Sequence, residues 1–174
     1  MKLPPLNHVT LSVADLERSA AFYEGVLGYR RTLDSPVEQP AIAGYLHAPP
    51  GLKGRMLMLE AEAPGHLGMI ELTEWDPPPA PASGPKRPGD PGVTFLAFEL
   101  PPGETIEALC EHLDRHDIPL WSDVTTIELE GYPPMRAVIV EDPDGLLIEL
   151  VQVPTREEVR AFRAAAVDSP GGRV

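Results

Sequence analysis

Hydrophobic and polar positions follow two kinds of periodicity along the chain, first that of a strand and then that of a helix. Residues 8–13 alternate polar and apolar side chains, which is typical of a strand with one buried face. An apolar stripe at helical spacing then runs from Leu16 to Leu27, directly after Asp15, a residue type that caps helices well. The pattern predicts a strand followed by a helix that ends at Gly28.

The second half of the chain repeats this order. Residues 95–100 alternate in the same way, and an apolar stripe from Ile106 to Leu113 marks a helix that we expect to begin at Glu104. Each half then continues with three strands. The strands are predicted at residues 29–33, 55–59 and 68–72 in the first half, and at 121–129, 136–140 and 146–150 in the second. Each half is therefore expected to be a βαβββ module of an α+β fold.

Proline-rich and irregular stretches set the expected boundaries of these modules. The prediction is a first module at 4–76 with an insertion at 37–53 that holds a short helix, a proline-rich linker at 77–92, a second module at 93–153, and a C-terminal helix with a frayed tail at 154–174. The sequence Asp142-Pro143-Asp144-Gly145 predicts a tight turn between the last two strands.

Composition and charge narrow the possible partners and compartments. The chain has 14 Lys and Arg against 27 Asp and Glu, a net charge of −13, and no cluster of cations for a phosphate backbone or an anionic membrane. Its apolar runs are far shorter than the roughly 20 residues of a membrane span. The single cysteine, Cys110, excludes a disulfide scaffold and fits a reducing cytosol. We expect a cytoplasmic protein without nucleic-acid or membrane partners.

Three side chains are the first candidates for chemistry. The tripeptide Ile-Glu-Leu closes each half, so that Glu71 and Glu149 lie in the middle of apolar strands. A carboxylate confined in such surroundings needs a cation, a proton or hydrogen bonds, although a glutamate in a strand often faces solvent. His8 lies opposite the apolar face of the first strand. One imidazole and two carboxylates suit a divalent Zn, Ni, Co, Mn or Fe ion.

Two longer motifs carry a family resemblance. The opening run at residues 7–29 is N-H-V-T-L-S-V-A-D-L-E-R-S-A-A-F-Y-E-G-V-L-G-Y, and the closing run at 141–150 is E-D-P-D-G-L-L-I-E-L. Both resemble the signatures of the vicinal oxygen chelate superfamily, which includes glyoxalase I, bleomycin-resistance proteins, extradiol dioxygenases and methylmalonyl-CoA epimerase. The resemblance covers residues 6–152. It implies paired curved sheets around an open cleft, with one metal ligand from the first and last strand of each module.

Carried over to this chain, the resemblance assigns His8 as the first ligand, Glu71 as the second and Glu149 as the fourth. The third position, usually a histidine, falls on Phe95, which cannot ligate a metal. His47 and His66 would replace it only if their loops folded into the cleft. The resemblance therefore implies a metal site of three ligands, weaker than the full set, or a site without a metal.

Two functions stay open on this basis. The first is a metal-dependent lyase, isomerase or epimerase for a small oxygen-chelating substrate, in which Glu71 or Glu149 also acts as the catalytic base. The second is a metal-free, drug-sequestering binding protein with Phe95 in its pocket. In both, we expect Met58 and Trp121 to form an apolar wall, and Arg136 to pair with an acidic ligand group or with Glu149. The C-terminal helix suits packing onto the domain or onto the partner in a homodimer.

Overall fold

The chain divides into two compact units, residues 1–85 and 86–174, and the division falls within the predicted linker at 77–92. The computed structural model describes residues 5–38, 45–46, 49, 51–62, 67–78 and 91–168. Each unit contains a βαβββ arrangement, so the predicted α+β class and the duplicated module are confirmed. Within the described residues, no helix has both the length and the apolar run needed to cross a membrane.

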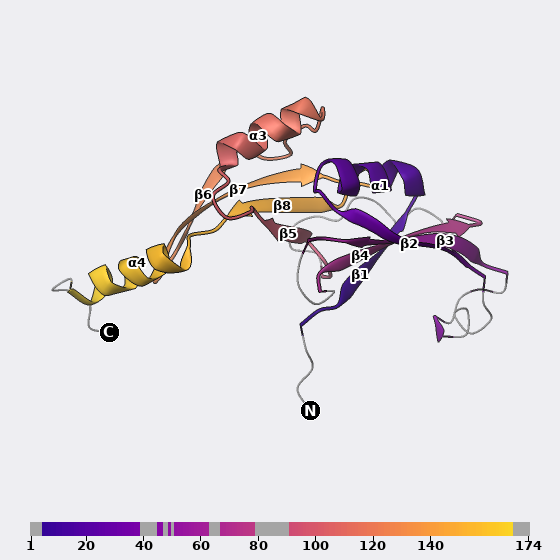
Figure 1. Cartoon of the computed structure of the whole chain (residues 1–174), viewed down its shortest axis with the longest axis horizontal. Helices are drawn as coiled ribbons and strands as arrows, with labels where there is room; N and C mark the ends of the chain where they lie inside the picture. Colours follow the sequence, from indigo (N-terminus) through magenta and orange to yellow (C-terminus); the bar gives the residue numbers. More distant parts are fainter. Residues whose placement is uncertain are drawn as a thin grey trace. The chain divides into compact units, whose positions relative to one another are not determined.

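Unit 1 contains a four-stranded mixed sheet with helix α1 on one face (Figure 1). Its elements are β1 (His8–Val13), α1 (Leu16–Gly25), β2 (Arg30–Val37), β3 (Lys53–Glu60) and β4 (Met69–Asp76). The strand order is β1-β4-β3-β2, with β1 parallel to β4 and the other neighbours antiparallel. The helix packs on β3 and β4, so one face of the sheet is covered.

The hydrophobic pattern decides which face of unit 1 the helix covers. Leu57, Leu59, Ile70 and Leu72 are buried, and so are Leu16, Ala20, Phe22 and Tyr23 of α1. Because side chains alternate along a strand, Glu71 lies on the opposite face. At the start of α1, the Asp15 carboxylate accepts the Arg18 N–H at 2.9 Å, which confirms the predicted N-cap.

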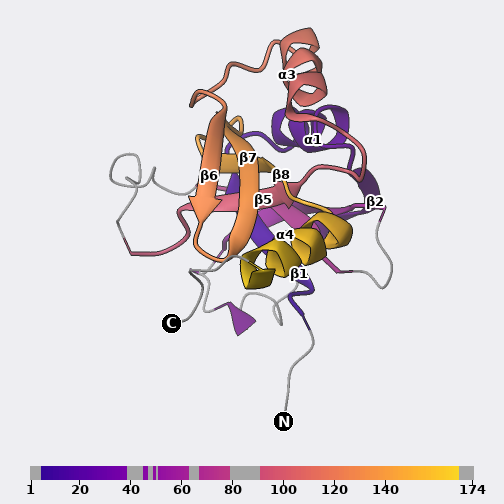
Figure 2. The same cartoon turned by 90° about the vertical axis from the view of Figure 1, so that its left-hand side faces the viewer.

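Unit 2 repeats the topology of unit 1 and adds a helix. Its elements are β5 (Phe95–Glu99), α3 (Ile106–Arg115), β6 (Thr125–Leu129), β7 (Tyr132–Glu141), β8 (Leu147–Gln152) and α4 (Arg156–Asp168). The strand order β5-β8-β7-β6 corresponds to that of unit 1, again with one parallel pair, β5 with β8. The added helix α4 lies beside β7 (Figure 2).

Three predicted boundaries in unit 2 are wrong. Helix α3 begins at Ile106 rather than at Glu104, because the Thr105 hydroxyl caps it by accepting the Ala108 N–H at 3.2 Å. Strand β6 begins at Thr125, and Trp121 before it donates its backbone N–H to the Ile139 carbonyl. Strand β7 begins four residues early, at Tyr132, because its first residues pair with β6 before β8 becomes a neighbour at Arg136.

Parts of three predicted segments lie outside the described residues. These are about half of the insertion at 37–53, with most of the stretch in which the short helix is expected, most of the linker at 77–92, and the end of the tail after residue 168. The tail helix itself lies where it is expected. It is α4, and the Thr155 hydroxyl caps its start by accepting the Glu158 N–H.

The predicted turn at residues 142–145 is present, and a buried carboxylate holds it. Asp142 is 6% exposed, and its Oδ1 accepts the N–H groups of Asp144 and Leu146 at 2.9 and 2.8 Å. Gly145 closes the turn with a φ of 81°, where a residue with a Cβ would be strained.

We expect Asp142→Ala to lower the free energy of unfolding by about 2 kcal/mol, because two N–H groups lose an ionised acceptor. Asp144→Ala is the matched control, since the Asp144 backbone N–H keeps its partner. Denaturant unfolding monitored by circular dichroism measures both. An equal loss in the two variants would contradict the assigned role of the Asp142 carboxylate.

Candidate metal and ligand site

His8 and Glu71 lie on the same face of the unit 1 sheet. In the parallel pair of β1 and β4, Thr10 is opposite Glu71 and His8 is opposite Met69. Residues two apart along a strand share a face, so His8 and Glu71 are diagonal neighbours on the face that α1 leaves uncovered. Long side chains at such diagonal positions are within reach of each other.

Each of these two side chains has a hydrogen-bond partner that orients it. The His8 Nδ1 lies 2.8 Å from the Asn7 amide oxygen, which only accepts hydrogen bonds. The Nδ1 therefore carries a proton, and in the neutral ring Nε2 keeps the lone pair that a metal ion or a substrate proton would use. Glu71 is half-buried, and its Oε1 accepts the Thr73 hydroxyl at 3.2 Å.

Unit 2 places Phe95 and Glu149 in the same relation. Ala97 is opposite Glu149 and Phe95 is opposite Leu147, which is the register of β1 and β4 repeated. Phe95 thus occupies the position of His8, and Glu149 occupies that of Glu71. Phe95 is 39% exposed and Glu149 is half-buried. The strand register supports the alignment that put a phenylalanine at the third ligand position.

Among the described residues, the candidate metal donors are His8 and Glu71 in unit 1 and Glu149 in unit 2. Among the residues that the structure describes, neither unit by itself gathers three or more His, Cys, Asp or Glu side chains that could hold a metal. His47 and His66, the predicted replacements for the third ligand, lie outside the described residues. His8 with Glu71 is therefore a half-site of one nitrogen and one carboxylate, and Glu149 is a single further donor.

The predicted substrate-binding residues on the strands do not all lie on the sheet faces that carry Glu71 and Glu149. Met58 is the partner of Glu71 across β3 and β4, and Phe95 shares the face of Glu149. Arg136 lies on the other face of unit 2, where it is the partner of Gln152 on β8 and its guanidinium pairs with Glu107 of α3. The expected pair between Arg136 and Glu149 does not form, because the two side chains leave opposite faces of the sheet.

Arg136 lowers the pKa of its partner Glu107 below the usual value of a carboxyl, mainly through their side-chain hydrogen bond.

Trp121 precedes β6 and is 50% exposed, so half of its surface is available for contact with a ligand or another chain.

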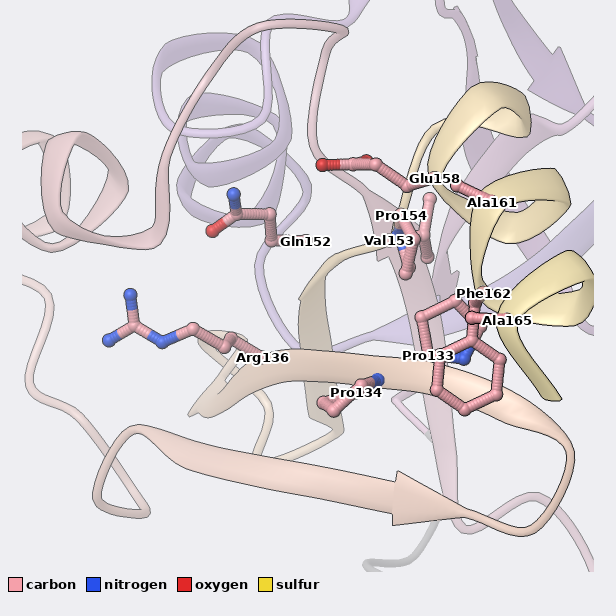
Figure 3. A pocket seen from close by; sticks show the side chains of 10 residues that line it. All are labelled: Pro133, Pro134, Arg136, Gln152, Val153, Pro154, Glu158, Ala161, Phe162 and Ala165. Atoms are coloured by element: carbon pink, nitrogen blue, oxygen red, sulfur yellow. The ribbon is translucent and has the colours of Figure 1, made fainter. Parts of the chain in front are cut away.

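Sequence reasoning missed the side chains that hold the candidate donors. Thr73 is two residues beyond Glu71, and the strand period of two would have placed both on one face. Asn7 is next to His8, but no pattern in the sequence shows that its amide turns toward the imidazole. A cavity between β7, the end of β8 and α4 was also missed (Figure 3). It depends on where α4 packs, which no local pattern encodes.

Comparisons with known proteins agree with the fold. A chain from Bacillus cereus, described as a glyoxalase family protein, superposes with a TM-score of 0.72 at 20% identity over 89% of this chain and 97% of that one. A glyoxylase/bleomycin resistance protein/dioxygenase domain from Frankia sp. gives a TM-score of 0.60 at 18% identity, over 92% and 99% of the two chains. At these identities the likeness shows the fold alone.

Sequence comparison gives the family. Uncharacterized protein YaeR of Escherichia coli (strain K12) is 31% identical over 150 residues, which is 86% of this chain and 97% of YaeR. The family model of the Glyoxalase/Bleomycin resistance protein/Dioxygenase superfamily matches residues 5–150, from before the strand that bears His8 to the strand that bears Glu149. The chain therefore belongs to the glyoxalase/bleomycin resistance protein/dioxygenase superfamily.

Proposed function

We propose that this protein is a divalent-metal-dependent lyase or isomerase for a small substrate with two neighbouring oxygen atoms. In this proposal, His8, Glu71 and Glu149 are the protein ligands, and the ion is Zn, Ni, Co, Mn or Fe. The observation that carries the proposal is the half-site of unit 1, where His8 and Glu71 share one open face and the His8 Nδ1 is already bonded to Asn7. A carbonyl partner on the second ring nitrogen is common for histidines that bind metals.

The chemistry of the donor set fits a divalent ion. Imidazole nitrogen and carboxylate oxygen are both ligand types that zinc and related divalent ions bind in proteins, and three protein ligands leave positions for a substrate. Phe95 adds no donor, so the proposed set has three protein ligands. When bound, such an ion polarises substrate oxygens and stabilises negative charge that develops on them.

The chain's own residues supply orientation and proton transfer. The Asn7 amide oxygen fixes the ring of His8, and the Thr73 hydroxyl fixes one oxygen of Glu71. A glutamate oxygen takes a proton from the carbon beside the substrate carbonyl and, in an isomerase, returns it to the same or the neighbouring carbon. Met58 beside Glu71 and Phe95 near Glu149 provide apolar surface that excludes water from this step.

A second candidate is a metal-free binding protein, and Phe95 favours it. An exposed aromatic ring on the face of a carboxylate suits a cationic aromatic ligand, which would stack on Phe95 and pair with Glu149. In either case we infer a small-molecule ligand and a cytoplasmic location, which the net charge of −13 and the single cysteine support. We also infer a homodimer, because the C-terminal helix α4 suits packing onto a partner.

Metal content separates the two candidates. We expect protein purified without a histidine tag to hold about one equivalent of a transition metal, as a folded site with deprotonated ligands would. Glu149→Gln should lose the metal, and Glu128→Gln, an exposed carboxylate on β6, should keep it. Elemental analysis by mass spectrometry measures all three proteins.

A chain that takes up no Mn, Fe, Co, Ni or Zn even after incubation with each would contradict the metal-dependent mechanism. The binding-protein candidate would then stand, and cationic aromatic compounds would be the ligands to screen. Metal that is retained in Glu149→Gln would show that the ion does not use this carboxylate.

A further inference from the structure

The cavity of unit 2 lies on the sheet face that carries Arg136, opposite the face of Glu149. It has a volume of about 520 Å³ and lies between β7, the end of β8 and α4. Pockets for small ligands have volumes of roughly 300–1,000 Å³. Every residue that lines it belongs to unit 2, so the cavity is a property of that unit alone.

One end of the cavity carries hydrogen-bond donors. Arg136 and Gln152 are direct partners across β7 and β8, and both line the cavity. Helix α3 binds one atom of each, since Glu107 pairs with the Arg136 Nη1 and the Ile106 N–H donates to the Gln152 Oε1 at 3.1 Å. Holding the Gln152 oxygen fixes its amide, so that the NH₂ group stays available as a donor. The Arg136 Nε and Nη2 can also donate.

The other end of the cavity is apolar. Pro134 and Pro154 are each two residues along their strand or its extension from Arg136 and Gln152, and they continue the same face. Ala161, Phe162 and Ala165 of α4 complete this end. Figure 3 shows Arg136 and Gln152 at one side of the cavity and Phe162 with Ala165 at the other.

We propose that this cavity is a second ligand site, separate from the candidate metal site, for a small carboxylic acid with an aromatic or aliphatic body. The carboxylate accepts hydrogen bonds from Arg136 and Gln152. The body packs on Pro134, Pro154 and Phe162. A guanidinium matches a carboxylate because two parallel N–H groups meet two oxygens, and a neighbouring amide donor adds a third bond.

The acidic side chains near the cavity, Glu107 and Glu158, are both engaged in other hydrogen bonds, which is compatible with a ligand carboxylate at Arg136 and Gln152. Glu107 is 63% exposed, and its ion pair with Arg136 is made at Nη1. Glu158 lines the cavity, but its Oε2 accepts both the N–H and the hydroxyl of Thr155 at 2.7 and 2.8 Å. Those bonds hold the Glu158 carboxylate at the start of α4 and lower its pKa. A monocarboxylate is therefore favoured over a dianion.

The test uses 4-phenylbutyrate and its uncharged analogue 4-phenyl-1-butanol on the full chain. Two-dimensional ¹H–¹⁵N NMR titrations locate each compound and give its dissociation constant. We expect 4-phenylbutyrate to bind with a dissociation constant on the order of 1 mM, which is usual for a ligand of this size, and to shift amide signals of β7, β8 and α4. Arg136→Met should weaken the binding of 4-phenylbutyrate by about tenfold. Arg115→Met, which replaces an exposed arginine at the end of α3, should leave this binding unchanged.

Two further variants keep the result interpretable. Ala161→Trp should fill the cavity and weaken the binding of both compounds while Arg136 stays in place. Because two different variants test the same cavity, a folding defect in one of them does not decide the outcome. Glu149→Gln should leave binding unchanged, which separates this site from the proposed metal site. The proposal is overturned if 4-phenylbutyrate gives no saturable shifts, if its shifts fall on the strands of unit 1, or if Arg136→Met binds it as tightly as Arg115→Met does.

Discussion

Phe95→His is expected to raise the affinity of the chain for Zn²⁺ or Ni²⁺ by at least about 100-fold, because it adds a direct metal ligand. Removing a residue that only hydrogen-bonds to a metal ligand already changes the affinity by roughly 10–100-fold, and a direct ligand should contribute more. The reason is the strand register. Phe95 stands to Glu149 as His8 stands to Glu71, so an imidazole at residue 95 would complete a set of two histidines and two glutamates. Competition with a chromogenic chelator measures the affinity.

Two matched variants make this result specific. Val93→His places an imidazole on an exposed residue just before β5 and should leave the affinity unchanged. Phe95→Ala removes the ring without adding a donor, so its metal affinity should stay near that of the natural chain. If Phe95→His binds no more tightly than Phe95→Ala, residue 95 is not near the ion, and the alignment of the third ligand fails.

Leu57→Ala is expected to lower the free energy of unfolding of unit 1 by about 3 kcal/mol, within the range for a buried leucine. Leu57 is 0% exposed, and it lies on β3 between β2 and β4, on the face that α1 covers. Removing it leaves a cavity that flanking strands cannot close, since both are fixed by their hydrogen-bond ladders. Leu33→Ala, at a leucine that is 50% exposed, should change the free energy by no more than about 0.5 kcal/mol.

The measurement has to distinguish the two units, because the unfolding transitions of a chain with two compact units need not coincide. Trp75 lies in unit 1 and Trp121 in unit 2, so a Trp121→Phe background makes tryptophan fluorescence report on unit 1 alone. Equal midpoints for Leu57→Ala and Leu33→Ala in urea would show that the core of unit 1 does not depend on this side chain.

Several features of the fold could be predicted because they depend on neighbouring residues. The period-two alternation at residues 8–13 and 95–100 placed β1 and β5, and the apolar stripes placed α1 and α3. Asp15 marked a helix start, and residues 142–145 marked a turn. Helix α3 was placed two residues early because Thr105, rather than Glu104, provides the capping oxygen.

The candidate site was only partly predictable. The repeated Ile-Glu-Leu and the position of His8 identified the carboxylates and the imidazole from the sequence. The partner of Arg136 could not be found in this way, since it depends on which face of β7 meets α3. The sequence offered Glu149 as a partner, and the sheet puts the two residues on opposite faces.

The sequence by itself thus determined the duplicated βαβββ order, the α+β class and the residue types available for chemistry, because periodicity, caps and turns act between residues close along the chain. The tertiary structure alone decided the face on which Arg136 lies, the hydrogen bonds that orient His8 and Glu71, and the cavity beside α4. These depend on pairing between strands far apart in the sequence and on helix docking, where a shift of one residue would turn each side chain to the other face.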